Sequence, residues 1–252
     1  MGQQFVIIRL GGFGWRMLER LADVCDDIIV IDRDAELVEK AKDLARQALS
    51  ADALNERVID KLVPPQADAA IVDLGDSLEA SILVTSKLKQ MGVRNIVVKT
   101  DTEDRGAILT LVGATRIVYP DRAAADQIAP VLASPELFAY MPIGPGLALG
   151  EVRPPEDLVG KTLVEANLRQ TRNVNVVAIR KRDSEELSWA EPTYTLAAED
   201  TLLVAGSDEA LFALSGAKPP RKRRSISEFL HGIIKSGEKT VPKAKETNGI
   251  SG

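Results

Sequence analysis

The chain has 252 residues, of which 45% are hydrophobic and 27% charged, and its formal net charge is −5. This composition is typical of a globular protein, no apolar run approaches the roughly 20 residues of a membrane-spanning helix, and the first ten residues carry no signal-peptide pattern. A single cysteine, Cys25, excludes an internal disulfide framework, and a single histidine, His231, leaves little general acid–base or metal chemistry.

Short β-branched runs alternate with amphipathic helical stretches over the first 120 residues. The predicted strands are Gln4–Leu10, Asp27–Asp32, a short one near Gln47–Leu49, Ala69–Leu74, Asn95–Lys99 and Arg116–Tyr119. The predicted helices are Gly12–Ala22, Asp34–Gln47, Ala53–Lys61, Ser77–Gln90 and Glu103–Val112. Such alternation forms βαβ units around a parallel sheet covered on both faces. We therefore predict an α/β fold, with a Rossmann-type doubly wound parallel sheet over residues 1–138.

The alternation of strands and helices ends at a proline- and glycine-rich stretch, Met141–Gly146, which we interpret as a linker or the edge of a new unit. The predicted elements beyond it are a strand at Leu147–Arg153, a helix opening near Thr162, and strands at Val174–Lys181 and Thr201–Ala205. The spacing of Thr162 and Glu165 is that of a capping box. We predict a small α+β lobe over residues 139–217.

The last segment, residues 218–252, is predicted to be a flexible, largely disordered basic tail. It carries nine Lys/Arg against three Asp/Glu, so the tail has a charge of about +6 and the remainder about −11. The acidic body argues against nucleic-acid binding. Apolar residues from Ile226 to Ile234 recur at helical spacing after a basic run, Arg221–Arg224, which predicts a short amphipathic helix. Such a helix could lie on a membrane surface, dock on a partner, or fold back on the body of the protein.

The strongest local signal is the glycine loop between the first strand and the first helix, Gly11-Gly12-Phe13-Gly14. In a Rossmann fold, such a loop places backbone amides and the positive end of a helix against a phosphate. Asp32 follows at the end of the second strand, where a carboxylate can accept hydrogen bonds from a ribose diol. Without a ligand, the glycines would only permit a sharp turn, and Asp32 would be a surface acid beside Arg33.

Three further positions belong to the candidate nucleotide site. Arg9 stands where the first glycine of the G-x-G-x-x-G pattern is expected. Its side chain could crowd the turn, lie against a phosphate, or mark a pocket that has lost its ligand. Asp52 could contact adenine or cap a helix, and Asp73 ends the fourth strand at the ligand-binding edge, where it could also be merely solvated.

Seven segments occur in the order found in the RCK (KTN) domain of Trk/Ktr potassium-uptake regulatory subunits. They are Leu10–Gly14, Val30–Asp34, Ala67–Val72, Glu79–Thr85, Gly113–Pro120, Pro155–Leu163 and Gly206–Glu209. The chain resembles that family, with its TrkA-N and TrkA-C lobes, over about residues 3 to 215.

The resemblance implies an N-terminal lobe that binds ATP, ADP or NAD(H) and a C-terminal lobe that binds cyclic di-AMP in some members. Carried over by position, Gly11, Gly14, Asp32 and Asp52 would line the nucleotide site. The family has glycine at the place of Arg9 and commonly an arginine at the place of Gly12, so this chain inverts both. Asp121 stands where the family has an acid near a dimer-interface cation site, which makes a divalent cation a further candidate ligand.

The resemblance also implies dimers that assemble into a ring beneath a membrane potassium-translocating subunit, on the inner face of the cell membrane. We expect a cytoplasmic nucleotide-sensing regulator of that transporter or channel and not an enzyme. An NAD(P)-dependent oxidoreductase is the alternative, but the sequence contains no Tyr-x-x-x-Lys pair and its one histidine lies in the tail. A ligand-free structural partner in the ring is the other alternative.

Overall fold

A computed structural model describes residues 3–65 and 67–217. These residues form two compact units that divide after Ala129. The domain boundaries predicted from the sequence, after residues 138 and 217, remain predictions.

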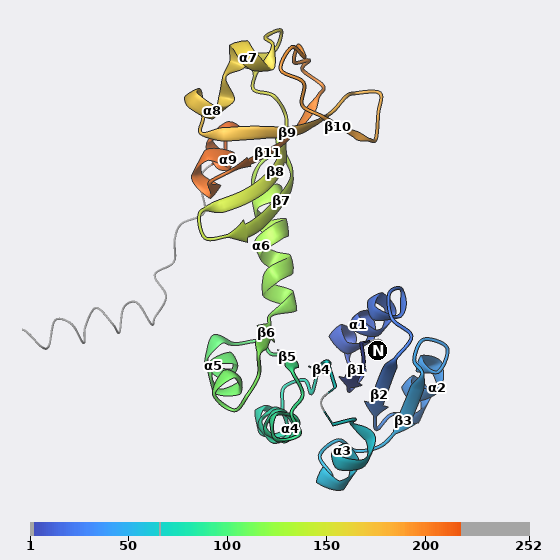
Figure 1. Ribbon diagram of the computed structural model, residues 1–252. Helices are drawn as coiled ribbons and strands as arrows, with labels where there is room; N and C mark the ends of the chain where they lie inside the picture. Colours follow the sequence, from blue (N-terminus) through green and yellow to red (C-terminus); the bar gives the residue numbers. More distant parts are fainter. Residues whose placement is uncertain (1–2, 66, 218–252) are drawn as a thin grey trace, which may run out of the picture. The chain divides into compact units, whose positions relative to one another are not determined.

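The first unit is built around a six-stranded parallel sheet with the strand order β3-β2-β1-β4-β5-β6 (Figure 1). Its strands are β1 (Phe5–Ile8), β2 (Ile28–Asp32), β3 (Gln47–Ser50), β4 (Ala69–Val72), β5 (Asn95–Lys99) and β6 (Arg116–Val118). Its helices are α1 (Gly12–Ala22), α2 (Ala35–Ala41), α3 (Glu56–Leu62), α4 (Leu78–Gln90), α5 (Glu103–Leu111) and α6 (Pro120–Ala133), whose last four residues belong to the second unit. The predicted Rossmann-type class is confirmed for this unit.

Helices cover both faces of the sheet because the central strands are apolar on both sides. Val6 and Ile8 of β1 share a core with residues of α3, α4 and α5. Ile7 belongs to a second core with residues of α1 and α2. All four residues of β4 and all five of β2 are buried, which is the pattern of strands inside a doubly covered parallel sheet. The order of the strands places the break between β1 and β4, and ligands bind at such a point on the carboxyl edge.

The second unit contains a five-stranded antiparallel sheet with the order β10-β9-β11-β8-β7. Its strands are β7 (Leu137–Gly144), β8 (Leu147–Val152), β9 (Val174–Arg180), β10 (Leu187–Trp189) and β11 (Thr201–Gly206). Its short helices are the 3₁₀ helix Glu156–Leu158, α7 (Leu163–Ala166), α8 (Leu168–Thr171) and α9 (Asp208–Leu214). Leu211 and Phe212 of α9 are fully buried against this sheet. The predicted small α+β lobe is therefore confirmed.

In the first unit, one predicted helix is too long and one helix was not predicted. The helix expected at Asp34–Gln47 ends at Ala41, because Gln47 already pairs with Ile29 of β2 at the edge of the sheet. The chain after Tyr119 forms α6, a helix that the sequence analysis missed. Pro120 suits its first position, where the missing amide has no helical partner.

The stretch Met141–Gly146 is not a linker. It forms the end of β7 and the turn of the β7–β8 hairpin, and Gly146 adopts φ +74° in that turn. Pro142 is tolerated because β7 is the edge strand of the sheet. The predicted capping box at Thr162 and Glu165 is present at the start of α7. The predicted helix in the basic tail lies outside the described residues.

Candidate functional site

The glycine loop joins β1 to α1 through a strained residue. Arg9 has φ +70°, and its backbone amide donates to the Ile31 carbonyl at 2.8 Å. Arg9 thus adopts the left-handed conformation that glycine adopts without strain. For a non-glycine residue this conformation costs about 1–2 kcal/mol. The Arg9 side chain does not prevent the turn, because the backbone adopts this left-handed conformation. A Cβ on Gly14 would lie 2.3 Å from the Arg9 carbonyl oxygen, which explains why position 14 is glycine.

The Arg9 side chain leaves the loop toward β4 and passes over Gly75. A Cβ added to Gly75 would lie 2.8 Å from Arg9 Nη1, and Gly75 itself has φ +63°. Within the described part of the chain, the Arg9 guanidinium has no ion pair and no hydrogen bond. A cation in this position is available to an anionic ligand.

Asp32 is a buried carboxylate that organises the loop, which corrects the interpretation of it as a surface acid. Its exposed fraction is 4%. Oδ2 accepts from the Leu10 amide at 2.5 Å and Oδ1 accepts from the Asp34 amide at 2.8 Å. Each carboxylate oxygen has a second lone pair, so these bonds leave Asp32 able to accept from a ribose hydroxyl. Asp34, beside it, caps α2 by accepting from the Glu36 and Leu37 amides.

Asp73 is also buried, with an exposed fraction of 3%, so the interpretation of it as a solvated acid was wrong. Its Oδ2 accepts from the Gly14 amide at 3.1 Å, in the first turn of α1. A Cβ on Gly11 would lie 2.4 Å from the same oxygen. The Asp73 carboxylate therefore lies directly over the glycine loop.

Two cavities open at the carboxyl edge of the sheet, and Arg9 lines both. The first has a volume of about 240 Å³ and is mostly apolar. It is lined by Arg9, Ile31, Asp32, Arg33, Ala51, Asp52, Ala53, Leu54, Leu74, Ser77 and Ala80. The second has a volume of about 450 Å³ and is lined by Arg9, Gly11, Gly12, Phe13, Arg16, Asp73, Gly75, Lys99, Pro120 and Asp121. Every candidate residue named from the sequence for the nucleotide site lines one of these cavities except Gly14, whose amide donates to Asp73 beside the second cavity.

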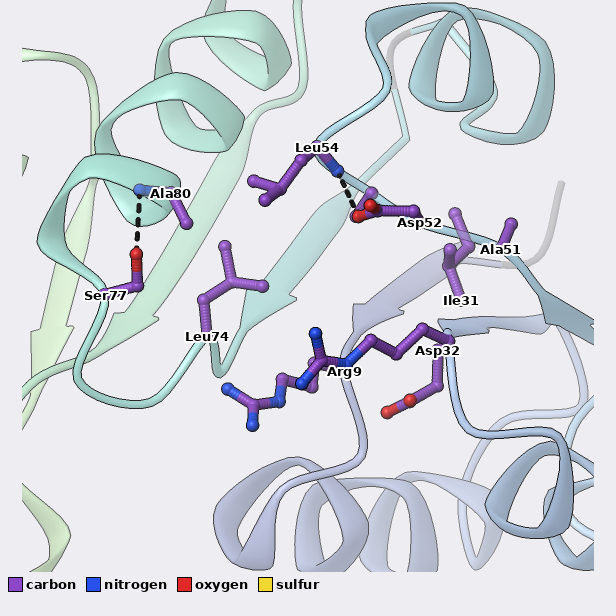
Figure 2. A pocket seen from close by; sticks show the side chains of 11 residues that line it. Arg9, Ile31, Asp32, Ala51, Asp52, Leu54, Leu74, Ser77 and Ala80 are labelled. Carbon is purple, nitrogen blue, oxygen red and sulfur yellow. Dashed lines mark hydrogen bonds between the residues drawn. The ribbon is translucent and has the colours of Figure 1, made fainter.

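Figure 2 shows the first cavity, with Leu54 and Leu74 on its apolar side and Arg9 and Asp32 among the polar residues that line it. Asp52 does not cap a helix: its Oδ1 accepts from the Leu54 amide at 2.9 Å, and Asn55 caps α3 instead. This bond fixes the turn that carries Leu54. An apolar cavity with a few polar groups at its rim suits a nucleobase and its ribose.

The second cavity contains basic side chains that the sequence analysis did not select. Arg16 pairs with Glu19 at 2.6 Å, and hydrogen bonds from Arg16 and then from Trp15 lower the pKa of the Glu19 carboxyl. Lys99 at the end of β5 pairs with Asp101 at 3.4 Å. Lys99 could have been identified from its place at the end of a parallel strand. Arg16 could have been identified because it lies one helical turn after Gly12.

Asp121, the candidate metal ligand, is exposed at the start of α6 and lines the second cavity. Within residues 3–65 and 67–217, no group of three or more His, Cys, Asp and Glu side chains could hold a metal ion. The cation at Asp121 remains a prediction.

A further cavity of about 250 Å³ lies in the second unit, between the α7–α8 region and β9. Its lining combines apolar residues such as Leu168 and Val174 with Asn167, Arg169 and Asn175. It is the candidate site for a second ligand. In the part of the chain that the structure describes, no helix is both long and apolar enough to cross a membrane.

Comparison with known proteins identifies two domains. The TrkA-N domain matches residues 5–120 and the TrkA-C domain matches residues 149–215. Ktr system potassium uptake protein C of Bacillus subtilis is 32% identical over 207 residues, which cover 82% of this chain and 93% of that protein. Ktr system potassium uptake protein A of Vibrio alginolyticus is 28% identical over 209 residues, covering 83% of this chain and 94% of that protein.

Among solved structures, the GsuK RCK domain is 17% identical with a TM-score of 0.59, and the match covers 88% of this chain and 49% of that one. A GsuK channel bound to NAD is 14% identical with a TM-score of 0.58, covering 100% of this chain and 49% of that one. This chain thus spans about half the length of those chains, and at such identity the likeness concerns the fold.

Proposed function

This chain belongs to the family of Ktr potassium uptake proteins with TrkA-N and TrkA-C domains, and from that premise we propose that it is a nucleotide-sensing regulatory subunit of a membrane potassium transporter. The ligand of the first unit is an adenine nucleotide, such as ATP or ADP, or NAD(H). The chain acts at the inner face of the cell membrane, as copies assembled into dimers and a larger ring beneath the pore subunit.

The observation that carries this proposal is the pair of cavities that meet at Arg9. One is apolar with Asp32 at its rim, and the other lies over the first turn of α1 with Arg16 and Lys99 on its walls. A base with its ribose fits the first environment, and a negatively charged group fits beside the unpaired guanidinium of Arg9.

The regulation follows from differential binding. A ligand shifts a conformational equilibrium only when it binds two states with different affinity, and a difference of about 1–3 kcal/mol is enough to matter. Nucleotide contacts with Arg9, β2 and the end of β4 would favour one geometry of the assembled subunits over another. The activity of the transporter would depend on that geometry.

A non-enzymatic role is supported by the names of the relatives, which are potassium uptake proteins. The only histidine of the sequence, His231, lies outside the described residues. The oxidoreductase alternative would return if hydride transfer to a substrate were measured. The cavity in the second unit is the place where we expect cyclic di-AMP to bind.

The test is calorimetric titration of the full-length chain with ATP, ADP, NAD⁺, NADH and cyclic di-AMP. The variant Leu54→Asp places a charge in the apolar cavity at a residue that is already 49% exposed, so the fold should tolerate it. We expect adenine-nucleotide affinity to fall by roughly tenfold or more, because the base loses apolar contacts beside a charge.

The matched control is Val24→Asp, at a residue 80% exposed after the end of α1, which should bind like the wild type. Equal binding by both variants would place the ligand elsewhere. No binding by the wild-type chain at millimolar nucleotide would leave a scaffold that works through assembly alone.

A further inference from the structure

Asp73 occupies the position at which a glycine loop usually receives a phosphate. The amides of the first turn of a helix are unsatisfied and attract anions. In this chain an anion is already present, because Asp73 Oδ2 lies 3.1 Å from the Gly14 amide. Gly11 makes room for that carboxylate, because a Cβ at position 11 would lie only 2.4 Å from Asp73 Oδ2.

The burial of Asp73 makes this contact a barrier to a second anion. The side chain is 97% removed from solvent, and it has its hydrogen bond inside the loop. Two negative groups at one helix end repel each other, and water screens a buried pair poorly. A diphosphate on the loop would have to displace Asp73 or lie against it.

Arg9 offers a different place for a negative group. Its guanidinium lies over Gly75, lines both cavities, and has no ion pair in residues 3–65 and 67–217. The strained φ of +70° at Arg9 holds the start of this side chain at the junction of the two cavities. One phosphate attached to a nucleoside in the apolar cavity would reach this junction without entering the loop.

Resting on the proposed function, we propose that Asp73 and Arg9 determine the ligand class of this site. Asp73 excludes di- and triphosphate groups from the loop amides, and Arg9 binds a single phosphate. The preferred ligand is a nucleoside monophosphate, and ADP, ATP and dinucleotides bind no more tightly than it does.

The test is titration of the full-length wild-type chain with adenosine, AMP, ADP, ATP and NAD⁺. We expect AMP to bind roughly fivefold or more tightly than adenosine, since a charge-assisted hydrogen bond to Arg9 is added. ADP, ATP and NAD⁺ should show no gain over AMP. The wild-type series alone decides the main claim, because it depends on no variant that must fold.

Two variants assign the roles. Asp73→Asn removes the charge and keeps an oxygen that can accept from the Gly14 amide, and it should tighten ADP and ATP by about tenfold while adenosine stays within about twofold. Arg9→Gln should abolish the difference between AMP and adenosine. Asp76→Asn removes an equal charge from an exposed residue of the same loop and should behave like the wild type.

Three outcomes overturn the inference. If the wild-type chain binds ADP or ATP about tenfold more tightly than AMP, or if Asp73→Asn changes no phosphate dependence, Asp73 does not exclude phosphates and the nucleotide-sensing proposal still stands. If no compound binds the wild type or any variant, both proposals fail together.

Discussion

Gly12 and Gly14 lie two residues apart in α1 but have different surroundings. A Cβ on Gly12 would meet nothing within 4 Å, whereas a Cβ on Gly14 would meet the Arg9 carbonyl oxygen at 2.3 Å. The obstacle at Gly14 is backbone, which cannot rotate away as a side chain can. Because Arg9 is held by its own hydrogen bond to Ile31, the loop has little freedom to move.

Gly14→Ala should therefore lower the free energy of unfolding by about 1–3 kcal/mol, since the loop or α1 must shift to admit the methyl group. Urea denaturation followed by circular dichroism measures this change. Gly12→Ala is the matched control and should be neutral or stabilising by about 0.5 kcal/mol, because it restricts the unfolded chain without a clash. Equal stability of the two variants would mean that the loop is looser than its contacts indicate.

The candidate site was predictable from the sequence in its outline and not in its contacts. The spacing of Gly11, Gly14 and Asp32 identified the loop and the acid that follows it, because both depend on residues close along the chain. The contact of Asp73 with Gly14 joins residues 59 positions apart. Whether an acid at the end of β4 points to solvent or over α1 depends on the packing of the loop, which no local pattern contains.

At the scale of elements, α7 is a helix of four residues that depends on its cap. The Thr162 hydroxyl accepts from the Glu165 amide, and the Glu165 carboxylate accepts from the Thr162 amide at 2.8 Å. So short a helix has too few internal hydrogen bonds to form alone. Thr162→Ala should lower the free energy of unfolding of the second unit by about 1 kcal/mol. Urea denaturation measures it, and Thr193→Ala, at an exposed residue of the same unit, is the control.

The same cap predicts a dependence on pH. The pKa of Glu165 lies below its ordinary value of 4.5, because the backbone amide of Thr162 and then its hydroxyl donate to the carboxylate. A carboxyl whose pKa is lowered by folding stabilises the protein above its ordinary pKa and loses that effect as the pH falls through the lowered value. The stability difference between the wild type and Glu165→Ala should therefore shrink on acidification from about pH 7 to about pH 3. A constant difference would contradict the role of charge in the cap.

Some elements escaped prediction for a physical reason. The parallel strands were found because β1, β2 and β4 are apolar on both faces, a pattern that burial imposes. By contrast, no residue within α6 is fully buried, so the helix carries no strong apolar stripe. β7 contains Pro142 and Gly144, which local preference assigns to a turn, and only its pairing with β8 makes it a strand.

At the scale of the whole molecule, each unit has its own hydrophobic core. Phe212, which is 2% exposed, is the largest fully buried side chain among residues 3–65 and 67–217. Phe212→Ala should lower the free energy of unfolding of the second unit by about 3–5 kcal/mol, which is a large fraction of the total stability of a small domain. Hydrogen exchange should show lost protection in β8, β9 and β11, with β1, β2 and β4 retaining theirs.

Phe138→Ala is the control for that experiment, since Phe138 is 40% exposed, and it should change exchange little. Equal loss of protection in both sheets after Phe212→Ala would show that the two units unfold as one.

The position of β1 in the sheet has a consequence for synthesis on the ribosome. β1 lies between β2 and β4, so one of its edges is covered once Asp32 has emerged and the other only after Val72 has emerged. At a rate of about 5–20 residues per second, that interval lasts on the order of seconds. During it, β1, whose four residues Phe5–Ile8 are all apolar, presents an open edge to other nascent chains. Fragments that stop before β4 should therefore be captured by chaperones or aggregate, while fragments that extend through β6 should fold.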